Sequence, residues 1–560
     1  MLALVFSCGS CGAPGVPGPH PELLLFNGRV YVQDDSQRIV EAIAIQAGRV
    51  LAIGTDEEIL ALAVEKTQRV DLEGRPVYPG FADAHAHLVG LGSALEGLDL
   101  VGTASFAEVI ERSRARHALL PTGEWMFGRG WDQNDWRDQS FPTHHALSAA
   151  FPQRPVVLVR IDGHALVANL AAMHAAGVTR ATPDPEGGRI EHDADGALTG
   201  VFIDRAEDLI WNAAPGMSLV AIERAIGVAT TAFHAQGITA VHDAGIDPSA
   251  LAILESMATE GRLRLRLHEM LDGSNDEFLQ RRFASGPQSD IGGTGTLAVR
   301  AVKLYADGAL GSRGAALLEE YSDDHGNLGL LLTSAEDMQR IVHEAVTAGF
   351  QVATHAIGDR GNRLTLDVYE QVVRARANGT AAIPDLRLRI EHAQVVHADD
   401  FQRFAELGVI PAMQAQHQTS DMPWAEDRLG PERVLGAYAW RSFRAAGCII
   451  PGGSDAPVEQ LDVVAQFLAA VARATPAGQP IGGWYPEQKL SRQEALNMLT
   501  IWPAFAAFRE QDLGRLLPGF RADLVIFSDD LMTVPIDQIM QCQPTMTIFG
   551  GEVVWLAQQP

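Results

Sequence analysis

The sequence predicts an α/β protein built as a (β/α)8 TIM-type barrel, with a β-sandwich domain formed by both chain ends and a large insertion after the first barrel strand. Three observations predict this fold. The middle of the chain repeats a strand-then-helix pattern, the two ends carry short hairpins, and the first two strand candidates lie too far apart for one crossover. We place the sandwich at residues 22–77 plus 510–560, the barrel at 78–509 and the insertion at about 100–215.

Composition excludes several classes of protein. The 560 residues are 47% hydrophobic and 20% charged, which is typical of a globular chain. With 43 Lys+Arg against 70 Asp+Glu the net charge is −27, which disfavours nucleic acid as a partner. No apolar run reaches the roughly 20 residues of a membrane-spanning helix. We therefore expect a small-molecule substrate, and neither a monomer nor a homo-oligomer is excluded.

Residues 1–21 are predicted to form a disordered tail or a lipoprotein-like tether. Val5–Cys8 is similar to the end of a bacterial lipoprotein signal, and Gly9–Pro21 is rich in Gly and Pro, as flexible tethers are. The apolar stretch before Cys8 is too short for a complete signal peptide. As the chain is written we expect a cytoplasmic protein. If the true start lies upstream, we expect a lipid-anchored bacterial envelope protein with Cys8 as the lipidated residue.

The chain ends carry hairpin patterns. Near the start, Leu23–Phe26 and Val30–Val32 flank an Asn-Gly pair, which is a strong hairpin signal. The same pattern returns at Asp523–Phe527 and Val553–Trp555. Hairpins this small cannot bury a face alone, so we expect the two ends to complete one sandwich together.

Eight strand candidates, each ending in polar residues, predict the closed barrel. They are Val77–His87, Ile238–Asp243, Leu263–His268, Val299–Asp307, Gln351–His355, Leu386–His392, Val409–Gln414 and Cys448–Asp455.

Potential metal ligands occur at the ends of several of these strands. His85 and His87 stand two residues apart, so a strand points both imidazoles to the same face. The other candidates are Lys303, His355, His392 and Asp455. Barrel active sites lie at the C-terminal ends of the strands, so these side chains are expected to converge there. Imidazoles with a carboxylate predict a divalent metal site that suits zinc, and also manganese, iron or cobalt.

Six further residues are candidate substrate contacts. They are Trp131, Asp132, His164, Asp307, Arg313 and His417. The first three belong to the insertion and either line the substrate pocket or support the insertion's own core. Asp307 and Arg313 either bind substrate or fix the loop after Lys303 through an ion pair. His417 either contacts substrate or is solvated, and Arg389 and Glu391 are expected to pair outside the barrel lumen because they alternate with His392.

At these residues the sequence resembles the amidohydrolase superfamily, in its YtcJ-like branch that contains the N-substituted formamide deformylases. The matching segments are Pro79–His87, Lys303–Arg313, Thr354–Asp359, Arg389–Gln394 and Gly453–Pro457 in the barrel, and Gly48–Gly54 and Pro518–Val525 at the chain ends. The resemblance covers nearly the whole chain from about residue 22 onward.

The resemblance implies two divalent metal ions and a ligand set. His85, His87 and Asp455 would hold one metal and His355 and His392 a second, with Lys303 bridging them as a carbamate. Nearby positive charge favours the neutral amine that can take up carbon dioxide. The alternative for Lys303 is an uncarboxylated residue beside a single metal.

This interpretation predicts a hydrolase that cleaves a C–N bond in a small amide or N-formyl compound. Metal would supply hydroxide at neutral pH, and Asp455 would carry the proton from water to the departing nitrogen. Asp455 and Lys303 are thus the predicted catalytic residues. One alternative is a mononuclear deaminase, which needs a Glu near the metal, whereas the acid after His355 is Asp359. Another alternative is a non-catalytic regulatory protein on the same fold.

Overall fold

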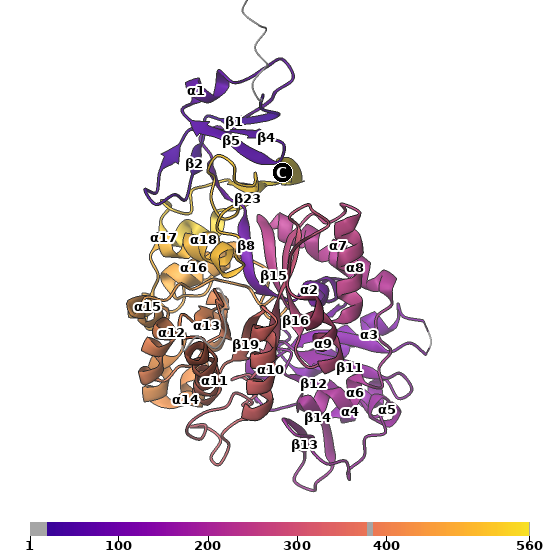
Figure 1. The fold of residues 1–560 in the computed structure, drawn as a ribbon. Helices are drawn as coiled ribbons and strands as arrows, with labels where there is room; N and C mark the ends of the chain where they lie inside the picture. The colour runs from indigo at the N-terminus through magenta and orange to yellow at the C-terminus, as the bar shows by residue number, and fades with distance from the viewer. Residues whose placement is uncertain (1–19, 122, 378–384, 559–560) are drawn as a thin grey trace, which may run out of the picture.

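The computed structural model describes residues 20–121, 123–377 and 385–558 (Figure 1). The predicted N-terminal tail, with Cys8 and Cys11, lies outside these ranges except for its last two residues. Within the described ranges no helix has both the length and the apolar character needed to cross a membrane.

A parallel barrel forms the centre of the molecule, and the predicted TIM-type fold is confirmed. Its strands run in the order β21-β20-β19-β18-β16-β15-β8, and β17 pairs antiparallel with β18 at the side. The strands are β8 (Phe81–Ala86), β15 (Ile238–Ile246), β16 (Arg266–Asp272), β17 (Gln288–Ile291), β18 (Leu297–Tyr305), β19 (Gln351–Ala356), β20 (Arg389–His392) and β21 (Ile410–Ala412). Nearly every residue of the parallel strands is buried, as expected for a sheet covered on both faces.

The barrel closes through a segment that is not a regular strand. The Met413 N–H donates to Pro451 O at 3.0 Å, and the Ala84 N–H donates to Gly452 O at 2.9 Å, so residues 451–456 bridge β21 and β8. A strand was predicted at Cys448–Asp455. Pro451 has no N–H for a sheet ladder, and Asp455 has a φ of 58°, so this segment cannot keep a regular pleat.

Helices cover the outside of the barrel (Figure 1). They are α2 (Leu88–Glu96), α7 (Leu219–Ala235), α8 (Pro248–Thr259), α9 (Asp276–Ser285), α10 (Ala335–Thr347), α11 (Asp359–Ala377), α12 (Phe401–Leu407), α13 (Ala415–Asp421), α14 (Ala425–Arg433), α15 (Trp440–Ala446), α16 (Val463–Ala472), α17 (Arg492–Met498) and α18 (Ile501–Ala506). Helix α10 illustrates why they form. Ser334 caps its N-terminus by accepting from the Asp337 N–H, and its buried residues Met338, Ile341 and Ala345 recur at helical spacing.

Two small sheets lie at the top of Figure 1; the N-terminal segment alone forms one, and both chain ends contribute to the other. One sheet has the order β5-β4-β1-β6, and the other has the order β24-β23-β22-β7-β2-β3. The elements are β1 (Leu23–Phe26), β2 (Arg29–Tyr31), β3 (Ile39–Val40), β4 (Ala42–Gln46), β5 (Arg49–Gly54), α1 (Asp56–Leu60), β6 (Gln68–Asp71), β7 (Pro76–Pro79), β22 (Leu524–Phe527), β23 (Pro544–Phe549) and β24 (Glu552–Leu556). Leu25, Ile43 and Ile548 share one apolar core.

The predicted first barrel strand, Val77–His87, is divided between two sheets. β7 belongs to the sandwich and β8 to the barrel, and Gly80 lies between them. A Cβ at Gly80 would come within 2.3 Å of the hydroxyl of Thr239 on β15, so the close approach of Gly80 to β15 requires glycine.

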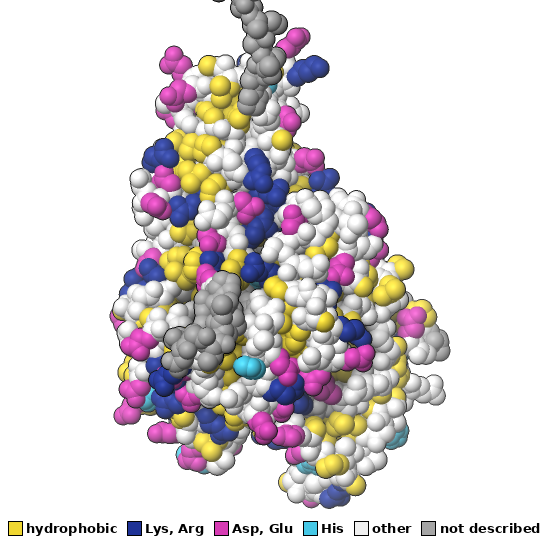
Figure 2. All heavy atoms as spheres, in the orientation of Figure 1, with side chains coloured by type: hydrophobic (Ala, Val, Ile, Leu, Met, Phe, Trp, Pro, Cys, Tyr) yellow, Lys and Arg dark blue, Asp and Glu magenta, His cyan; other side chains and the backbone are white. Residues whose placement is uncertain are grey.

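Arginine side chains join the sandwich to the barrel. Arg266 of β16 donates from Nη2 to Asp523 Oδ1 at 2.8 Å, and both side chains are buried. Arg264 pairs with Glu552 at 2.7 Å on the surface. Figure 2 shows Lys and Arg side chains gathered where the sandwich meets the barrel.

The insertion forms a separate six-stranded sheet with the order β13-β14-β12-β11-β10-β9, and Figure 1 places it at the lower right. Its elements are β9 (Leu98–Asp99), α3 (Phe106–His117), β10 (Met126–Trp131), α4 (His144–Ala150), β11 (Val156–Arg160), β12 (Ala165–Ala168), α5 (Leu170–Ala175), β13 (Gly188–His192), β14 (Leu198–Asp204) and α6 (Asp208–Trp211).

Candidate metal centre and cavity

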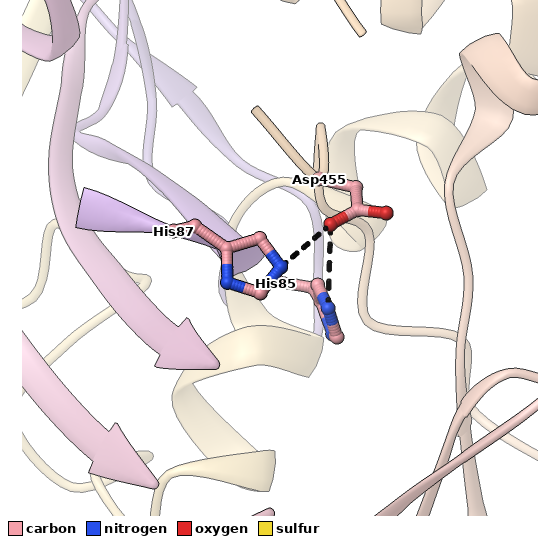
Figure 3. A group of neighbouring side chains, drawn as sticks. All are labelled: His85, His87 and Asp455. Carbon is pink, nitrogen blue, oxygen red and sulfur yellow. Dashed lines mark ion pairs between the residues drawn. The ribbon is translucent and has the colours of Figure 1, made fainter. Parts of the chain in front are cut away.

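Three side chains meet where β8 reaches the closing segment of the barrel. The Nε2 atoms of His85 and His87 lie 3.5 and 3.2 Å from Asp455 Oδ1 (Figure 3). The Asp455 N–H donates to His85 O at 2.7 Å, which fixes the backbone of the closing segment against β8. The left-handed φ of Asp455 turns its carboxylate towards both imidazoles.

The Asp455 carboxylate fits a metal ligand. Its Oδ1 is buried and has no hydrogen-bond partner among the described residues. Burial alone would raise the pKa of Asp455, but the neighbouring imidazoles outweigh burial and hold the pKa well below its ordinary value. A buried carboxylate oxygen surrounded by imidazole nitrogens matches the ligand preference of zinc and related divalent ions.

A second set of donors shares the same carboxylate. His417 Nε2 lies 3.3 Å and His392 Nδ1 lies 4.0 Å from Asp455 Oδ2. The His355 ring is 4.6 Å from the His392 ring between centroids, and its Nε2 lies 3.4 Å from Gly308 O. The described geometry therefore groups His392 with His417 and Asp455, and His355 stands beside this group. His417, which the sequence left open between a substrate contact and a solvated residue, lies within this second donor group.

Lys303 is buried at the centre of the cluster. Its Nζ lies 3.4 Å from His85 Nε2 and 4.6 Å from the centroid of the Tyr305 ring. Burial is the largest influence on this amine and lowers its pKa to about 8. A lysine with this pKa has an appreciable neutral fraction at neutral pH, which is the form that carbamate formation requires.

Glu391 is a site residue that the strand pattern did not predict. It was expected outside the barrel lumen, but it is fully buried and accepts from His85 Nδ1 at 2.5 Å. Arg389 Nε donates to the same carboxylate at 2.7 Å. The error comes from His392, whose φ of 70° breaks the alternation of β20, so His392 joins the side of the strand that Glu391 already occupies. The left-handed residue gave no signal in the sequence.

A cavity of about 1110 Å³ opens beside the cluster. Barrel residues His87, Lys303 and Tyr305 line it, and the insertion contributes Arg129 and His164. The insertion therefore walls the cavity into which the metal candidates open.

His164 is held in the cavity wall by Asp204. Its Nδ1 lies 2.7 Å from Asp204 Oδ1, and its ring is 5.1 Å from the His355 ring. Burial opposes protonation of His164, but the hydrogen bond and charge of Asp204 outweigh it and raise the pKa to about 9. Asp204 has φ 51° and ψ −128°, a strained conformation for a residue with a side chain. A Cβ at Gly308 would come within 2.5 Å of the Asp204 carboxylate, so the contact requires glycine there.

Comparison with known proteins places this site in a family. A model described as "Amidohydrolase family" matches residues 68–555. The chain belongs to the amidohydrolase family. It is 32% identical over 535 residues to YtcJ of Bacillus subtilis (strain 168), covering 94% of this chain and 98% of that protein. It is 27% identical over 542 residues to the N-substituted formamide deformylase of Arthrobacter pascens, covering 95% of this chain and 97% of that protein. An uncharacterized metal-dependent hydrolase from Pyrococcus horikoshii OT3 is 28% identical in sequence. Its structure matches this one with a TM-score of 0.74, covering 92% of this chain and 99% of that chain.

In this amidohydrolase two insertion residues expected near substrate lie away from the cavity. Trp131 is fully buried in the insertion's core, and its Nε1 donates to Leu158 O at 2.8 Å. Asp132 directly follows β10 and accepts from Arg160 Nη2 at 2.5 Å. Of the three insertion candidates, His164 is the one that lines the cavity.

The two candidates after Lys303 hold the loop of the amidohydrolase in place. Asp307 is fully buried and accepts from the backbone N–H groups of Ala316, Ile357 and Gly358 at 2.8 to 2.9 Å. Arg313 pairs with Asp323 at 2.9 Å rather than with Asp307. The loop is therefore fixed by backbone hydrogen bonds, and the ion pair expected between the two residues does not form.

Proposed function

We propose that this amidohydrolase is a metal-dependent hydrolase that cleaves the C–N bond of a small amide or N-formyl compound. The observation that carries the proposal is the unpartnered Asp455 Oδ1, which is buried between two imidazole nitrogens beside a large cavity. A buried carboxylate oxygen without a hydrogen bond is costly unless a cation takes it up.

The residues at the cavity floor have separable roles in this proposal. Two divalent ions, zinc first and manganese, iron or cobalt as alternatives, would be held by His85, His87, Lys303, His355, His392 and Asp455. When bound, such ions lower the pKa of water towards about 7 and polarise a carbonyl group. Asp455 takes the proton from the attacking water and delivers it to the departing nitrogen. His417 supports this role because its hydrogen bond to Oδ2 orients the carboxylate.

Lys303 is proposed to take up carbon dioxide as a carbamate, whose oxygens would then help to hold the ions. Its burial, its lowered pKa and its 3.4 Å approach to His85 support the proposal. His164 faces the same cavity from the insertion and is proposed to contact the substrate.

The deaminase alternative needs a Glu free to exchange protons with substrate. Glu391 is the nearby glutamate, and both of its oxygens are taken by Arg389 and His85. Asp359, the acid after His355, accepts from the Leu318 N–H at 2.8 Å. Neither of these two groups is free to exchange protons with a substrate, so neither supplies the acid that a deaminase needs.

The test combines metal analysis with an activity screen. Purified protein should contain close to two metal equivalents, and native mass spectrometry should find Lys303 heavier by one carbon dioxide. Metal-loaded protein should hydrolyse members of a panel of N-formyl amines, N-acyl amino acids and cyclic amides, and a chelator should abolish the hydrolysis. Equal activity in His85→Ala would refute the proposal. A single equivalent that metal and bicarbonate cannot raise would leave the mononuclear alternative.

A further inference from the structure

Arg129 is a cation in the cavity wall that forms no ion pair with the described acidic side chains. It belongs to β10 of the insertion, and its Nη2 donates to Ile161 O at 2.8 Å. Its Nε is buried without a hydrogen-bond partner, and Arg129 takes part in no ion pair among the described residues. A guanidinium has five N–H groups, so most of the donors of Arg129 are unused.

The neighbouring strand shows how a paired arginine looks in the same sheet. Arg160 of β11 binds Asp132 and Asp162, each at 2.5 Å. Asp162 already binds Arg160 directly, so it acts on Arg129 through space and without an ion pair. Glu207, the other acid near Arg129, is buried and has a pKa raised well above its ordinary value, chiefly by that burial. Neither acid forms an ion pair with Arg129, so its guanidinium keeps donors for a ligand.

The position of Arg129 suits a group at one end of a substrate. Its two terminal nitrogens lie 3.2 Å from where a Cβ of Gly163 would be, so this glycine leaves room at the guanidinium. The next residue, His164, places its ring 5.1 Å from that of His355. A ligand held at Arg129 thus lies on the side of the cavity from which His164 reaches the metal candidates, and the cavity of about 1110 Å³ is large enough for both ends of a small molecule.

We infer that Arg129 binds a carboxylate of the substrate, so that the proposed hydrolase prefers amides that carry a free carboxylate beside the C–N bond to be cleaved. Arginine binds carboxylates through charge-assisted hydrogen bonds, and an unpaired guanidinium in a partly buried wall gains most from such a ligand. The inference rests on the proposed function for the bond that is cleaved, but the binding of the carboxylate can be tested without turnover.

Acidic side chains outnumber basic ones on the cavity lining. Asp208, Asp247 and Asp272 lie on its lining, and the chain carries a net charge of −27. The preference must therefore come from direct contact at Arg129 and not from the overall field. It should persist at high ionic strength, where long-range steering is screened.

The kinetic test compares two substrates that differ in one charge. N-formylphenylalanine and its carboxamide, N-formylphenylalaninamide, are assayed by release of formate from the metal-loaded protein. Native protein should prefer the carboxylate at least 10-fold in kcat/KM. Arg129→Met should lower kcat/KM for the carboxylate about 10- to 100-fold, as expected for loss of a charge-assisted hydrogen bond, and should change the carboxamide by less than about 3-fold.

A matched variant controls for the change in charge. Arg205 also lies on the cavity lining but is exposed, so Arg205→Met removes the same charge from the rim. This variant should change kcat/KM by the same factor for the carboxylate and the carboxamide. If Arg205→Met alters the carboxylate preference as much as Arg129→Met does, the preference reflects the field and the inference is wrong. Arg129→Lys, which keeps the charge but not the planar donor group, should show an intermediate loss and serves if Arg129→Met does not fold.

A binding measurement separates this inference from the proposed function. Calorimetry on the metal-loaded protein should show phenylalanine binding about 10- to 100-fold more weakly to Arg129→Met than to native protein. The affinity for phenylalaninamide should differ little between the two proteins. Equal affinity of phenylalanine for both proteins would overturn the inference even if amides are cleaved. A loss of phenylalanine binding confined to Arg129→Met would support it even if neither formyl compound is hydrolysed, in which case the proposed function alone fails.

Discussion

The two ends of the barrel both bury charged side chains, but they satisfy them differently. At the end that faces the sandwich, both oxygens of Asp523 accept from Arg266, and Oδ1 also accepts from the Gly550 N–H at 2.8 Å. At the opposite end, Asp455 lies among four imidazoles and its Oδ1 has no hydrogen bond within the described chain. The Asp523 carboxylate is satisfied within the protein, whereas the bare oxygen of Asp455 among imidazoles leaves a position for a cation.

The largest expected effect separates the two roles of Asp455. Asp455→Asn keeps the size and one oxygen but cannot accept the proton, so kcat should fall about 100- to 10,000-fold while much of the metal stays bound. Steady-state kinetics on a confirmed substrate, with metal content measured on the same sample, provides the check. His85→Ala is the contrast, because removal of a direct ligand should lose the metal itself.

A specific outcome would contradict this assignment. If fully metallated Asp455→Asn keeps activity within a few-fold of the native protein, another residue carries the proton. His417 is then the next candidate, since its Nε2 lies 3.3 Å from Asp455 Oδ2.

The second prediction concerns the opposite end of the barrel. Arg266→Met leaves Asp523 buried without its cation, so the free energy of unfolding should fall by about 3 to 5 kcal/mol. The kcat of the folded enzyme should stay the same, because this pair lies far from the metal candidates along β16 and β18. Denaturant unfolding and kinetics on the same preparation test both statements.

A surface pair provides the control for that prediction. Arg264 and Glu552 form an ion pair at 2.7 Å, but both side chains are more than half exposed. Glu552→Gln should therefore lower the free energy of unfolding by less than about 1 kcal/mol. If both variants lower stability equally, burial is not what gives the Arg266–Asp523 pair its importance. If Arg266→Met instead lowers kcat, the two ends of the barrel are coupled and their comparison fails.

The strand ends at the rim could be predicted because regular strands have a fixed two-residue period. His85 and His87 follow that period, and the confirmed barrel places them together. The period fails where the backbone is left-handed. Asp455 and His392 both have positive φ values, so the expected eighth strand became an irregular segment and Glu391 entered the lumen unpredicted.

The insertion could be predicted least well from the sequence. The sequence shows which residues of the insertion are polar. Which of them reach the cavity depends on how its strands pair. Arg160 takes the carboxylates of Asp132 and Asp162, and Arg129 on the next strand has neither. A single sequence without known strand pairing cannot separate the two arginines.

The smallest expected effect concerns Glu391, which links the candidate ligand His85 to the buried Arg389. Its carboxylate receives the Nδ1–H of His85, which leaves Nε2 of that imidazole as the atom free for a metal. Glu391→Gln removes the charge and lets the imidazole turn, so metal affinity should weaken about 10- to 100-fold. Competition with a metal-sensitive chelator measures the affinity without reference to activity. Glu269→Gln controls for replacing a buried carboxyl group by an amide, because Glu269 is equally buried on β16 and bonds to none of the candidate ligands. Equal metal affinity in native protein and Glu391→Gln would show that the closing segment alone orients His85, and that the donor set at the rim does not depend on the charge behind it.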